Sequence, residues 1–579
     1  MSTPRDPETG GGPRSRRLPV WPVAFAVYLF HALLFGGWIV DDAGISFVYA
    51  RNLAQGHGLV SQPGLAPVEG YSNFLWVLLL TPPLLLHLFH PVWTPKLLSL
   101  GLAAGTFFLL DRSLTRLSGG SRGLSWMTLL LLAVCTPFVI WTVSGLENPL
   151  TVFLAVALFW ILVTERREEA PLPSSAGRWA LLAGAVAAGL AMTRPDGVVY
   201  AALYPLLTPR WGRQSVLTSL RSGAGRAALS IGVFALLFGA FLGFRVLYFG
   251  DLYPNTYYAK GSPSPVALLP LLTFQPPAVA KLFTLMYGFA GTWGGLLLVA
   301  LGAATAFLAG RRRFHWGHAA LLAFSGLAVF VYIVLPHDWM PEYRFATPLF
   351  PFFYSYVVLL AASLGGELFA EPSRRHLAAL AGGILAVGLS LVSFASRSVL
   401  FAAAPTVPFA ETVEDYGLRY NRYADLLGVR EGSLLVPDVG GTLWASRLRI
   451  YDLGALCDRT IARTRGVDQQ AFYDYVFAQA RPTFIHSHNY WTVVSALELD
   501  PRFRRDYVPI FEYDEPHGRQ RLGHDYHSGD WVRREVAQGR EAELLAIGAD
   551  LEEQYRRRLA SRAREASAPD GPLDPLSPP

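Results

Sequence analysis

The chain has 579 residues, of which 52% are hydrophobic and 16% are charged, and its formal net charge is +6. An ordinary soluble protein carries about 25% charged residues, so this composition excludes a soluble globular protein and predicts a polytopic membrane protein. We assign the positive charge to arginines in cytoplasmic loops and predict no nucleic-acid partner. The two cysteines, Cys135 and Cys457, lie in very different surroundings and predict no disulfide.

The N-terminal residues 1–19 are rich in Gly, Pro and Arg, and we expect them to be disordered and cytoplasmic. The apolar run Trp21–Val40 follows, and about 20 residues are enough to cross a bilayer as a helix. No small-residue cleavage site stands out after the run, which predicts an uncleaved first span.

The stretch Asp41–Asn73 follows this span and reads DDAGISFVYARNLAQGHGLVSQPGLAPVEGYSN. Two adjacent carboxylates at the end of a membrane helix are costly unless they have a use. A short helical pattern, Ile45–Gln55, comes next, and a Gly- and Pro-rich loop leads to the following apolar run. Polar, acidic and aromatic residues therefore lie between two membrane segments, which indicates a functional loop.

Arginine-rich breaks between the later apolar runs predict the topology, because such loops face the cytoplasm. These breaks are Asp111–Gly123, Thr164–Arg178, Pro209–Arg226, Gly310–His318 and Gly366–His376. We expect about eleven crossings, give or take two, within residues 20–398. The runs 74–89 and 97–110 together allow one net crossing, so one of them is re-entrant or its boundary is misplaced. The polar stretches that fall outside the cytoplasm are 41–73, Ser144–Asn148, Arg194–Gly197, Gly250–Pro277 and His337–Arg344.

Residues 399–560 differ in character and predict a small α/β domain outside the cytoplasm. The expected strands are Ser433–Val439, Leu448–Leu453, Thr483–His488 and Tyr507–Tyr513, and the expected helices are Glu411–Leu427, Asp468–Ala480 and Val536–Leu559. Asp438–Gly441 ends a strand, where a tight turn is the plainer interpretation and an acceptor site is the alternative. Residues 561–579 are rich in Pro, Ser and Ala and predict a disordered tail.

Six motifs in order carry a resemblance to a known family. They are DDAGISFVYARNLAQGHGLV with VEGYSNFLW in residues 41–76, SGLENPL at Ser144–Leu150, TRPDG at Thr193–Gly197, GDLYPNTYYAK at Gly250–Lys260, HDWMPEYRFATPLFP at His337–Pro351, and PDVGGTLW with YDLGALCDRTIA in residues 437–462. In these motifs the chain resembles the terminal arabinofuranosyltransferase-like branch of the GT-C glycosyltransferases of actinobacterial cell walls. The resemblance implies an α-helical polytopic membrane enzyme with a catalytic carboxylate in the first external loop, residues 41–73.

Asp41 and Asp42 are the candidate catalytic residues. Transfer of a sugar from a lipid phosphate needs a base for the proton of the acceptor hydroxyl, and a carboxylate at the membrane surface lies at the depth of the donor phosphate. In the alternative interpretation, Asp42 only caps the helix that starts at Ala43, and Asp41 is solvated. We favour Asp41 as the base and leave Asp42 open.

Four external cations are candidates for binding the donor phosphate, because a fixed positive charge and a bidentate guanidinium both suit a phosphate. They are Arg51, Arg194, Lys260 and Arg344. The alternative is local pairing of Arg194 with Asp196 and of Arg344 with Glu342.

Further external polar and aromatic residues are candidates for binding the sugar or the acceptor. They are Glu69, Tyr71, Asn73, Glu147, Asp196, His337, Asp338 and Trp339. For the aromatic side chains, which also include Trp76, Trp141 and Tyr343, a belt at the membrane surface is the plainer interpretation. The sequence shows no His/Cys ligand spacing, so we assign no cofactor and leave a divalent metal at the acids open.

The sequence contains no P-loop and no GxGxxG after a strand, so the energy for a reaction must come from the donor. The resemblance implies an inverting glycosyltransferase in the bacterial plasma membrane. It would move a sugar, arabinofuranose or another pentose, from a polyprenyl-phosphate donor to a cell-envelope glycan on the extracytoplasmic side. The alternatives are a transporter or flippase of lipid-linked sugars, for which we would expect internal repeats, and a GT-C transferase that modifies protein or lipid A.

Overall fold

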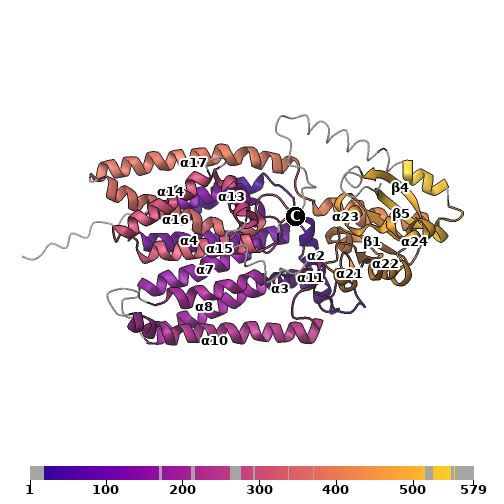
Figure 1. Ribbon diagram of the computed structural model, residues 1–579, viewed down its shortest axis with the longest axis horizontal. Helices are drawn as coiled ribbons and strands as arrows, with labels where there is room; N and C mark the ends of the chain where they lie inside the picture. The colour runs from indigo at the N-terminus through magenta and orange to yellow at the C-terminus, as the bar shows by residue number, and fades with distance from the viewer. Residues whose placement is uncertain are drawn as a thin grey trace, which may run out of the picture.

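The structure, a computed structural model, describes residues 19–167, 173–209, 216–260, 276–290, 294–336, 338–369, 371–515, 526–540, 542–549 and 553. Most helices run side by side in a long bundle, and a five-stranded sheet with its own helices lies beyond one end of the bundle (Figure 1). Helices α2 (Asp41–Ala54), α3 (Phe74–Leu85) and α11 (Asn255–Ala259) lie where the two parts meet. The predicted class, a helical polytopic domain followed by a small α/β domain, is confirmed.

Six helices of the described chain are long and apolar enough to cross a membrane, and a pair bent by 69° makes up to seven spans. The six are α4 (Trp93–Leu117), α7 (Asn148–Arg167), α10 (Val216–Phe249), α15 (Trp316–Val334), α16 (Leu349–Leu368) and α17 (Pro372–Ala403), and the bent pair is α5 (Gly123–Val134) with α6 (Thr136–Thr142). Shorter apolar helices are α1 (Trp21–Leu33), α3, α8 (Pro173–Thr193), α13 (Pro276–Ala290) and α14 (Gly294–Gly310). The count of about eleven crossings stays a prediction.

Helix α3 explains why the two apolar runs in residues 74–110 give one net crossing. Its 12 residues include Pro82 and Pro83, and a helix of that length covers only about 18 Å. After the helix, the ring of Phe89 lies 5.4 Å from that of Phe47 in α2 and 5.7 Å from that of Trp444 in the tail domain. The chain therefore begins and ends this helix on the side of the tail domain, and the crossing belongs to α4.

The Arg-Pro-Asp-Gly segment interrupts the bundle between two shorter pieces. Helix α8 ends at Thr193, and a 3₁₀ helix, η1 (Pro195–Ala202), leads into α9 (Leu203–Leu207). Gly197 is required here because a Cβ on it would lie 2.1 Å from the carbonyl oxygen of Leu190. The break is thus packed against its own preceding helix, as irregular backbone at membrane depth must be.

The sheet of the tail domain has the strand order β2-β1-β3-β5-β4. Its strands are β1 (Ser433–Val436), β2 (Arg449–Asp452), β3 (Phe484–Ser487), β4 (Tyr507–Glu515) and β5 (Tyr526–Arg533). β1 is parallel to β2 and β3, while β5 is antiparallel to β3 and β4. The four predicted strands are present, and β5 was missed because YHSGDWVR has few apolar residues. The chain passes from β1 to β2 on one side and then to β3 on the other, so the connections diverge between β1 and β3.

Both faces of the sheet are covered. In β1, Leu434 and Val436 belong to the core shared with the bundle, and Leu435 belongs to a second core on the opposite face, as the period of two residues in a strand requires. The covering helices are α18 (Phe409–Thr412), η5 (Val413–Leu418), α19 (Arg419–Leu426), α20 (Gly440–Ala445), α21 (Arg459–Thr464), α22 (Gln469–Asp474), η6 (Tyr475–Ala480), α23 (Asn489–Ser495), η7 (Leu497–Leu499), α24 (Pro501–Asp506) and α26 (Arg534–Ala537). The helix expected over Val536–Leu559 is interrupted: α26 ends at Ala537 and residues 542–549 are helical again.

Candidate active site

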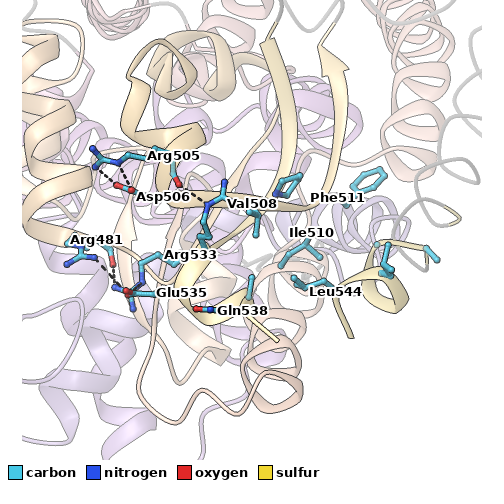
Figure 2. Close-up of a pocket in the computed structure, with 16 residues that line it drawn as sticks. Arg481, Arg505, Asp506, Val508, Ile510, Phe511, Arg533, Glu535, Gln538 and Leu544 are labelled. Carbon is cyan, nitrogen blue, oxygen red and sulfur yellow. Dashed lines mark hydrogen bonds and ion pairs between the residues drawn. The ribbon is translucent and has the colours of Figure 1, made fainter. Parts of the chain in front are cut away.

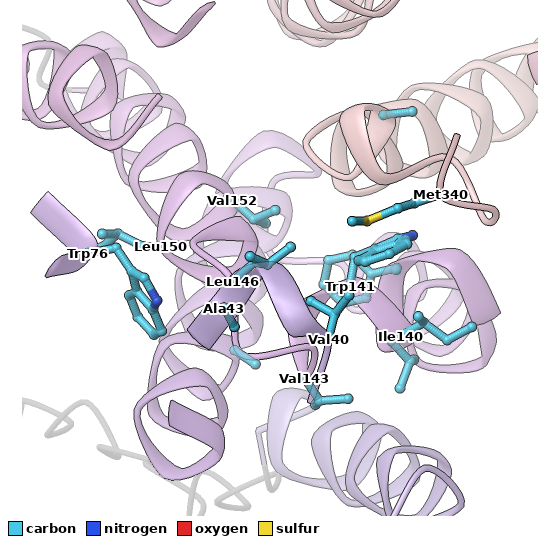
Figure 3. Close-up of a cluster of buried hydrophobic side chains, with 14 of the residues drawn as sticks. Val40, Ala43, Trp76, Ile140, Trp141, Val143, Leu146, Leu150, Val152 and Met340 are labelled. Carbon is cyan, nitrogen blue, oxygen red and sulfur yellow. The ribbon is translucent and has the colours of Figure 1, made fainter. Parts of the chain in front are cut away.

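The polar residues of the first loop pack against a cluster of buried apolar side chains, part of which Figure 3 shows. The turn between α6 and α7 lies against the start of α2, and a Cβ on Gly145 would come within 2.9 Å of Ile39. Trp76 donates through Nε1 to the carbonyl of Gly145 (3.0 Å), and Trp141 donates to the carbonyl of Glu342 (2.9 Å). Both indole rings are fully buried, so they hold backbone in place and offer no surface to a sugar.

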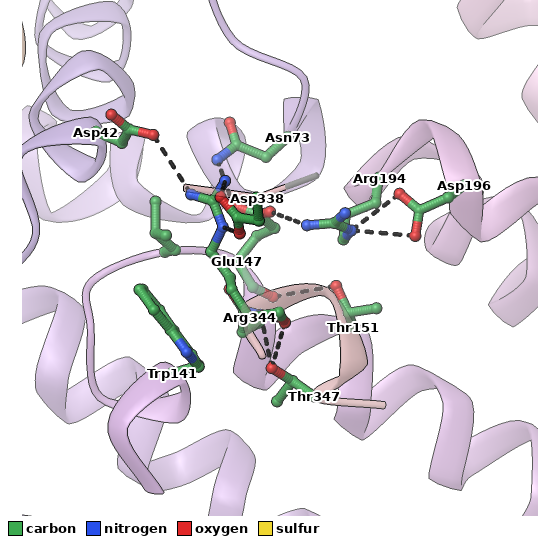
Figure 4. Close-up of polar contacts among 12 residues, drawn as sticks. Asp42, Asn73, Trp141, Glu147, Thr151, Arg194, Asp196, Asp338, Arg344 and Thr347 are labelled. Atoms are coloured by element: carbon green, nitrogen blue, oxygen red, sulfur yellow. Dashed lines mark hydrogen bonds and ion pairs between the residues drawn. The ribbon is translucent and has the colours of Figure 1, made fainter. Parts of the chain in front are cut away.

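Asp42 faces a guanidinium from a distant part of the chain (Figure 4). Arg344, at the start of the 3₁₀ helix η4 (Arg344–Ala346), approaches its carboxylate to 3.4 Å through Nη1. Asp338 holds the same guanidinium with contacts of 2.7 and 3.1 Å. The side chains of Arg344 and Asp338 are 7% and 9% exposed, whereas that of Asp42 is 30% exposed. Asp338 therefore orients the guanidinium, and Asp42 is the carboxylate of this trio that solvent reaches.

The turn that precedes Arg344 is unusual in its backbone. Glu342 and Tyr343 both have positive φ, 64° and 53°, a conformation that costs free energy for residues other than glycine. Arg397 of α17 donates through Nε to the carboxylate of Glu342 (3.1 Å). The alternative pairing of Arg344 with Glu342 is thus not formed, and Glu342 fixes the turn that places the guanidinium.

A second arginine lies beside this trio. Arg194 donates to Glu147 (3.0 Å) and to Asp196 (3.0 Å), and Asn73 donates to the other carboxylate oxygen of Glu147 (2.9 Å). Its guanidinium and that of the trio lie over the ring of Phe345, 4.9 and 4.8 Å from the ring centre, as favourable cation–π contacts do. Four predicted residues are therefore brought together next to the trio, and the local pairing of Arg194 with Asp196 is formed.

Lys260, at the end of α11, completes the cations of this group. Its side chain is exposed and lies within electrostatic range of Arg344 and Asp42. Its amino group has no hydrogen-bond acceptor within the described ranges. Trp339 is 62% exposed and is available to a ligand, and His337 lies outside the described residues.

Asp41 binds the tail domain instead of this group. Its carboxylate accepts hydrogen bonds from the backbone N–H groups of Gly440 (3.1 Å) and Gly441 (2.7 Å) and from the hydroxyl of Thr412 (2.5 Å). Burial and the nearby carboxylate of Asp438 raise the pKa of Asp41 to about 7, and the hydrogen bonds oppose that rise. A carboxylate that is 4% exposed and engaged by three donors is less accessible to an acceptor hydroxyl than Asp42, whose side chain is 30% exposed.

Arg51 binds the other end of the same tail-domain helix, α20. It donates to the carbonyl groups of Trp444 (2.8 Å) and Leu443 (3.1 Å) and lies 4.6 Å over the Trp444 ring. Helix α20 thus receives a carboxylate at its N-terminus and a guanidinium at its C-terminus, both from α2, and both signs suit its dipole. We therefore remove Arg51 from the candidate phosphate ligands and assign it to domain docking.

Glu69 and Tyr71 form a separate buried group with Arg245 of α10. The carboxylate of Glu69 lies 2.7 Å from Arg245, and the two side chains are 2% and 7% exposed. Burial raises the pKa of Glu69 to about 7, although Arg245 opposes the rise. The ring of Tyr71 packs against Tyr49 at 4.8 Å. Arg245 was not among the residues predicted from the sequence, although an arginine inside an apolar run is itself a functional signal.

The described residues show no metal site, and the pocket of the tail domain lies apart from the residues around Asp42. Within the described ranges, no three His, Cys, Asp or Glu side chains are grouped to hold a metal ion. A pocket of about 1090 Å³ opens beside β4 in the tail domain (Figure 2). Its charged residues pair locally, Arg505 with Asp506 (2.7 Å) and Arg533 with Glu535 (2.9 Å), and none of the residues around Asp42 lines it.

No protein-family model and no curated protein sequence matches the chain, but solved structures match its fold. The Archaeoglobus fulgidus oligosaccharyltransferase in complex with zinc and sulfate gives a TM-score of 0.54 at 13% identity, over 88% of this chain and 73% of that one. The oligosaccharyltransferase AglB from the same organism, in complex with an inhibitory peptide and a dolichol-phosphate, gives 0.51 at 11% identity, over 86% and 73%. Arabinofuranosyltransferase AftD from Mycobacteria gives 0.40 at 17% identity, over 88% of this chain and 41% of that one.

The two oligosaccharyltransferase structures each cover most of this chain, and the sequence identities are low enough that the likeness concerns the fold alone. This likeness gives the chain the fold of these oligosaccharyltransferase structures.

Proposed function

We propose that the protein is a membrane glycosyltransferase that moves a sugar from a polyprenyl-phosphate donor to a glycan acceptor. The observation that carries the proposal is the meeting of a carboxylate that solvent reaches, Asp42, with the buried guanidinium of Arg344, where the bundle joins the tail domain. AglB, which shares the fold, was solved with a dolichol-phosphate, and this supports a lipid-phosphate donor. The motif resemblance supports arabinofuranose or another pentose as the sugar and a cell-envelope glycan as the acceptor.

In this proposal Asp42 is the catalytic base. An acceptor hydroxyl oxygen attacks the anomeric carbon, the bond from that carbon to the donor phosphate oxygen breaks, and the hydroxyl proton passes to the Asp42 carboxylate. The long 3.4 Å contact with Arg344 leaves the carboxylate oxygens available. Inversion of the anomeric centre follows from attack opposite the leaving phosphate, and it needs a single base.

The leaving phosphate gains negative charge as its bond to the sugar breaks, and fixed cations stabilise that charge. Nη1 of Arg344 has two weak acceptors, Asp42 at 3.4 Å and the sulfur of Met340 at 3.0 Å, so it remains able to bind an oxygen of the phosphate. We assign Lys260 as the second phosphate ligand. Arg194 is already paired with the carboxylates of Asp196 and Glu147, so we assign it to holding these carboxylates in place and not to binding the phosphate. The exposed ring of Trp339 is a candidate surface for the sugar.

The arginine-rich turns support an orientation with the reaction outside the cytoplasm of a bacterial cell, at the plasma membrane. Arg116 lies in the last turn of α4 and Arg122 directly precedes α5, at the end of α4 remote from the tail domain. Loops rich in arginine face the cytoplasm, which directs Asp42 and the tail domain to the opposite side.

The test uses the purified full-length protein in nanodiscs with synthetic polyprenyl-phosphate arabinofuranose, polyprenyl-phosphate mannose as a second donor, and mass analysis of co-purified lipids. We expect release of polyprenyl phosphate together with a pentosylated product, and a polyprenyl-phosphate pentose among the bound lipids. Consumption of neither donor, with movement of labelled lipid-linked sugar across the bilayer, would contradict the proposal and support a transporter.

A further inference from the structure

Two histidines and an aspartate gather at the carboxyl ends of β1 and β3, where the connections of the sheet diverge. His486 lies in β3 and His488 follows it two residues later, so both side chains project from the same face of the strand. Asp438 comes two residues after β1, the neighbouring parallel strand. In open α/β sheets, the crevice outside the carboxyl ends of strands at such a divergence is where ligands bind.

His486 is oriented by a buried acid. Its Nδ1 lies 2.6 Å from Oδ1 of Asp530, and the same oxygen accepts from the hydroxyl of Tyr420 (2.5 Å). The other carboxylate oxygen, Oδ2, pairs with Arg419 (3.2 Å). Burial alone would raise the pKa of Asp530, but Arg419 and the hydrogen bonds lower it to about 2. Asp530 is therefore ionised and accepts the Nδ1 proton. Burial lowers the pKa of His486, which leaves a neutral ring with a bare lone pair on Nε2.

This Nε2 atom is buried without a hydrogen-bond partner among the residues that the structure describes, and His486 as a whole is 7% exposed. Buried polar atoms in proteins are almost always paired, so this lone pair calls for a donor, which a water molecule or a hydroxyl group of a ligand can supply.

The residues around the ring of His486 connect this buried position with the protein surface. The ring of His488 lies 5.2 Å from that of His486, and its Nε2 is 2.7 Å from Oδ2 of Asp438. The ring of Tyr416 lies 4.5 Å from the first histidine and is stacked on the second at 6.1 Å. His488 and Asp438 have side chains that are 21% and 18% exposed, so a ligand can reach them from solvent.

The same group borders the candidate active site. Asp438 precedes Gly440 by two residues, and the N–H of Gly440 holds the carboxylate of Asp41. The charge of Asp438 also acts directly on Asp41. Since Asp42 is the next residue of α2, a molecule bound at the histidines lies beside the helix turn that carries the proposed base.

We propose that His486, His488, Asp438 and Tyr416 form a subsite for the hydroxyl groups of a neutral sugar in the acceptor glycan, an inference that rests on the proposed function. Nε2 of His486 accepts a hydrogen bond from one hydroxyl, the His488–Asp438 pair binds a second, and the ring of Tyr416 covers an apolar sugar face. Bare acceptors and an aspartate repel an anion, and within the described ranges no three ligands are grouped for a metal ion.

The test measures binding of sugar without any donor, so that it does not depend on turnover. Saturation-transfer NMR with the full-length protein in nanodiscs uses an arabinofuranose disaccharide and a mannose disaccharide as the two trial ligands. We expect at least one of them to bind, and the dissociation constant to rise tenfold or more in His486→Phe and in Asp438→Asn. His486→Gln, which keeps an acceptor oxygen, recovers part of the loss. The matched control is His527→Gln, because His527 is a tail-domain histidine paired with Glu498 (3.1 Å), and it binds as the unchanged protein does.

Melting temperatures show whether each variant is folded, and Asp438→Asn keeps the test valid if the buried histidine proves essential for folding. Binding of neither disaccharide to the unchanged protein, or equal binding in His486→Phe and Asp438→Asn, overturns the subsite. Donor turnover is measured on the same samples. Sugar binding that depends on His486 without donor turnover contradicts the proposed function alone, while turnover with unaltered sugar binding in the variants contradicts the subsite alone.

Discussion

Adjacent residues in a helix project about 100° apart around its axis, so the side chains of Asp41 and Asp42 contact different parts of the molecule. The first is directed into the amide groups of the tail domain, where three donors surround it. The second reaches the group of buried charges between the bundle and the tail domain. The sequence predicts that one of the two acts as a base, but the partners of Asp41 lie about 400 residues further along the chain, as in the contact with Gly441. No local pattern could have distinguished the two carboxylates.

The role of Arg344 can be tested by its geometry. Arg344→Lys keeps the charge but loses the two-point contact with Asp338, and Arg344→Gln loses both. We expect the dissociation constant of the donor to rise tenfold or more in the glutamine variant and by less in the lysine variant, measured by titration of the purified protein. Arg459→Gln is the control, because Arg459 pairs with Asp251 at a partly exposed position. A donor affinity that is unchanged in Arg344→Gln removes this residue from the site.

The pKa of Asp41, about 7 in the folded chain against an ordinary value of 3.8, predicts a pH dependence of stability. Between these values the unfolded chain releases the proton and the folded chain keeps it, so the free energy of unfolding decreases as pH rises from about 4 to 7. Asp41→Asn lacks this proton. We expect the melting temperature of the unchanged protein to fall more steeply over that range than that of Asp41→Asn. Asp42→Asn serves as the control and keeps the steep fall, and parallel curves for all three proteins would refute the assignment.

At the scale of elements, α2 is the piece that joins the two parts of the molecule. Asp41 and Arg51 hold the two ends of α20, and between them glycines allow the helices to touch. A Cβ on Gly44 would lie 2.6 Å from the carbonyl carbon of Gly440, and a Cβ on Gly440 would lie 1.9 Å from the carbonyl oxygen of Asp41. The position of the proposed base therefore depends on the tail domain. The motif DVGG provides this contact, and the sequence alone could not show that its turn lies against the first loop.

This contact predicts the effect of a single methyl group. Gly440→Ala places an atom against backbone that cannot rotate away, and overpacking of this kind costs roughly 1–3 kcal/mol. We expect a lower melting temperature and reduced turnover with donor binding retained, since the donor cations lie on other elements. Gly101→Ala in α4 is the control, because nothing lies within 4 Å of a Cβ at that position. Normal turnover and stability in Gly440→Ala would show that α2 does not need this contact.

At the scale of the whole molecule, hydropathy and arginine bias predicted the helical bundle and the start of the α/β domain, because membrane insertion imposes long apolar runs. Hydropathy did not identify the elements whose length or polarity is unusual for their place in the fold. Helix α3 is apolar but too short to cross. Strand β5 lies inside the sheet although its sequence is polar, because an ion pair and a hydrogen bond from other elements compensate the burial of Asp530. An arginine inside an apolar run, such as Arg245, is a local signal, but its pairing with Glu69 across the fold cannot be derived from a local pattern.

The orientation of the molecule gives a further prediction. Gly432 directly precedes β1 in the tail domain, and Gly119 lies in the turn after α4, at the opposite end of the bundle. Reporter fusions at these two positions should give opposite sides of the membrane, with Gly432 outside the cytoplasm. A fusion in the N-terminal segment provides the cytoplasmic reference. Reporters at Gly432 and Gly119 that score on the same side would contradict the topology.

The central claim is that a single carboxylate, Asp42, is the base of a lipid-phosphate glycosyltransferase, and turnover of a polyprenyl-phosphate sugar by Asp42→Asn and Asp41→Asn tests it most directly. A positioned base contributes roughly 10²–10⁴ in rate. We expect a loss of that size in Asp42→Asn with donor affinity and melting temperature retained. Asp41→Asn should keep turnover within about tenfold of the unchanged protein, since its single amide oxygen still accepts one of the two N–H groups of α20 although its NH2 group cannot accept the other. Turnover above about a tenth in Asp42→Asn, or a selective loss of turnover in a stable Asp41→Asn, would contradict the account.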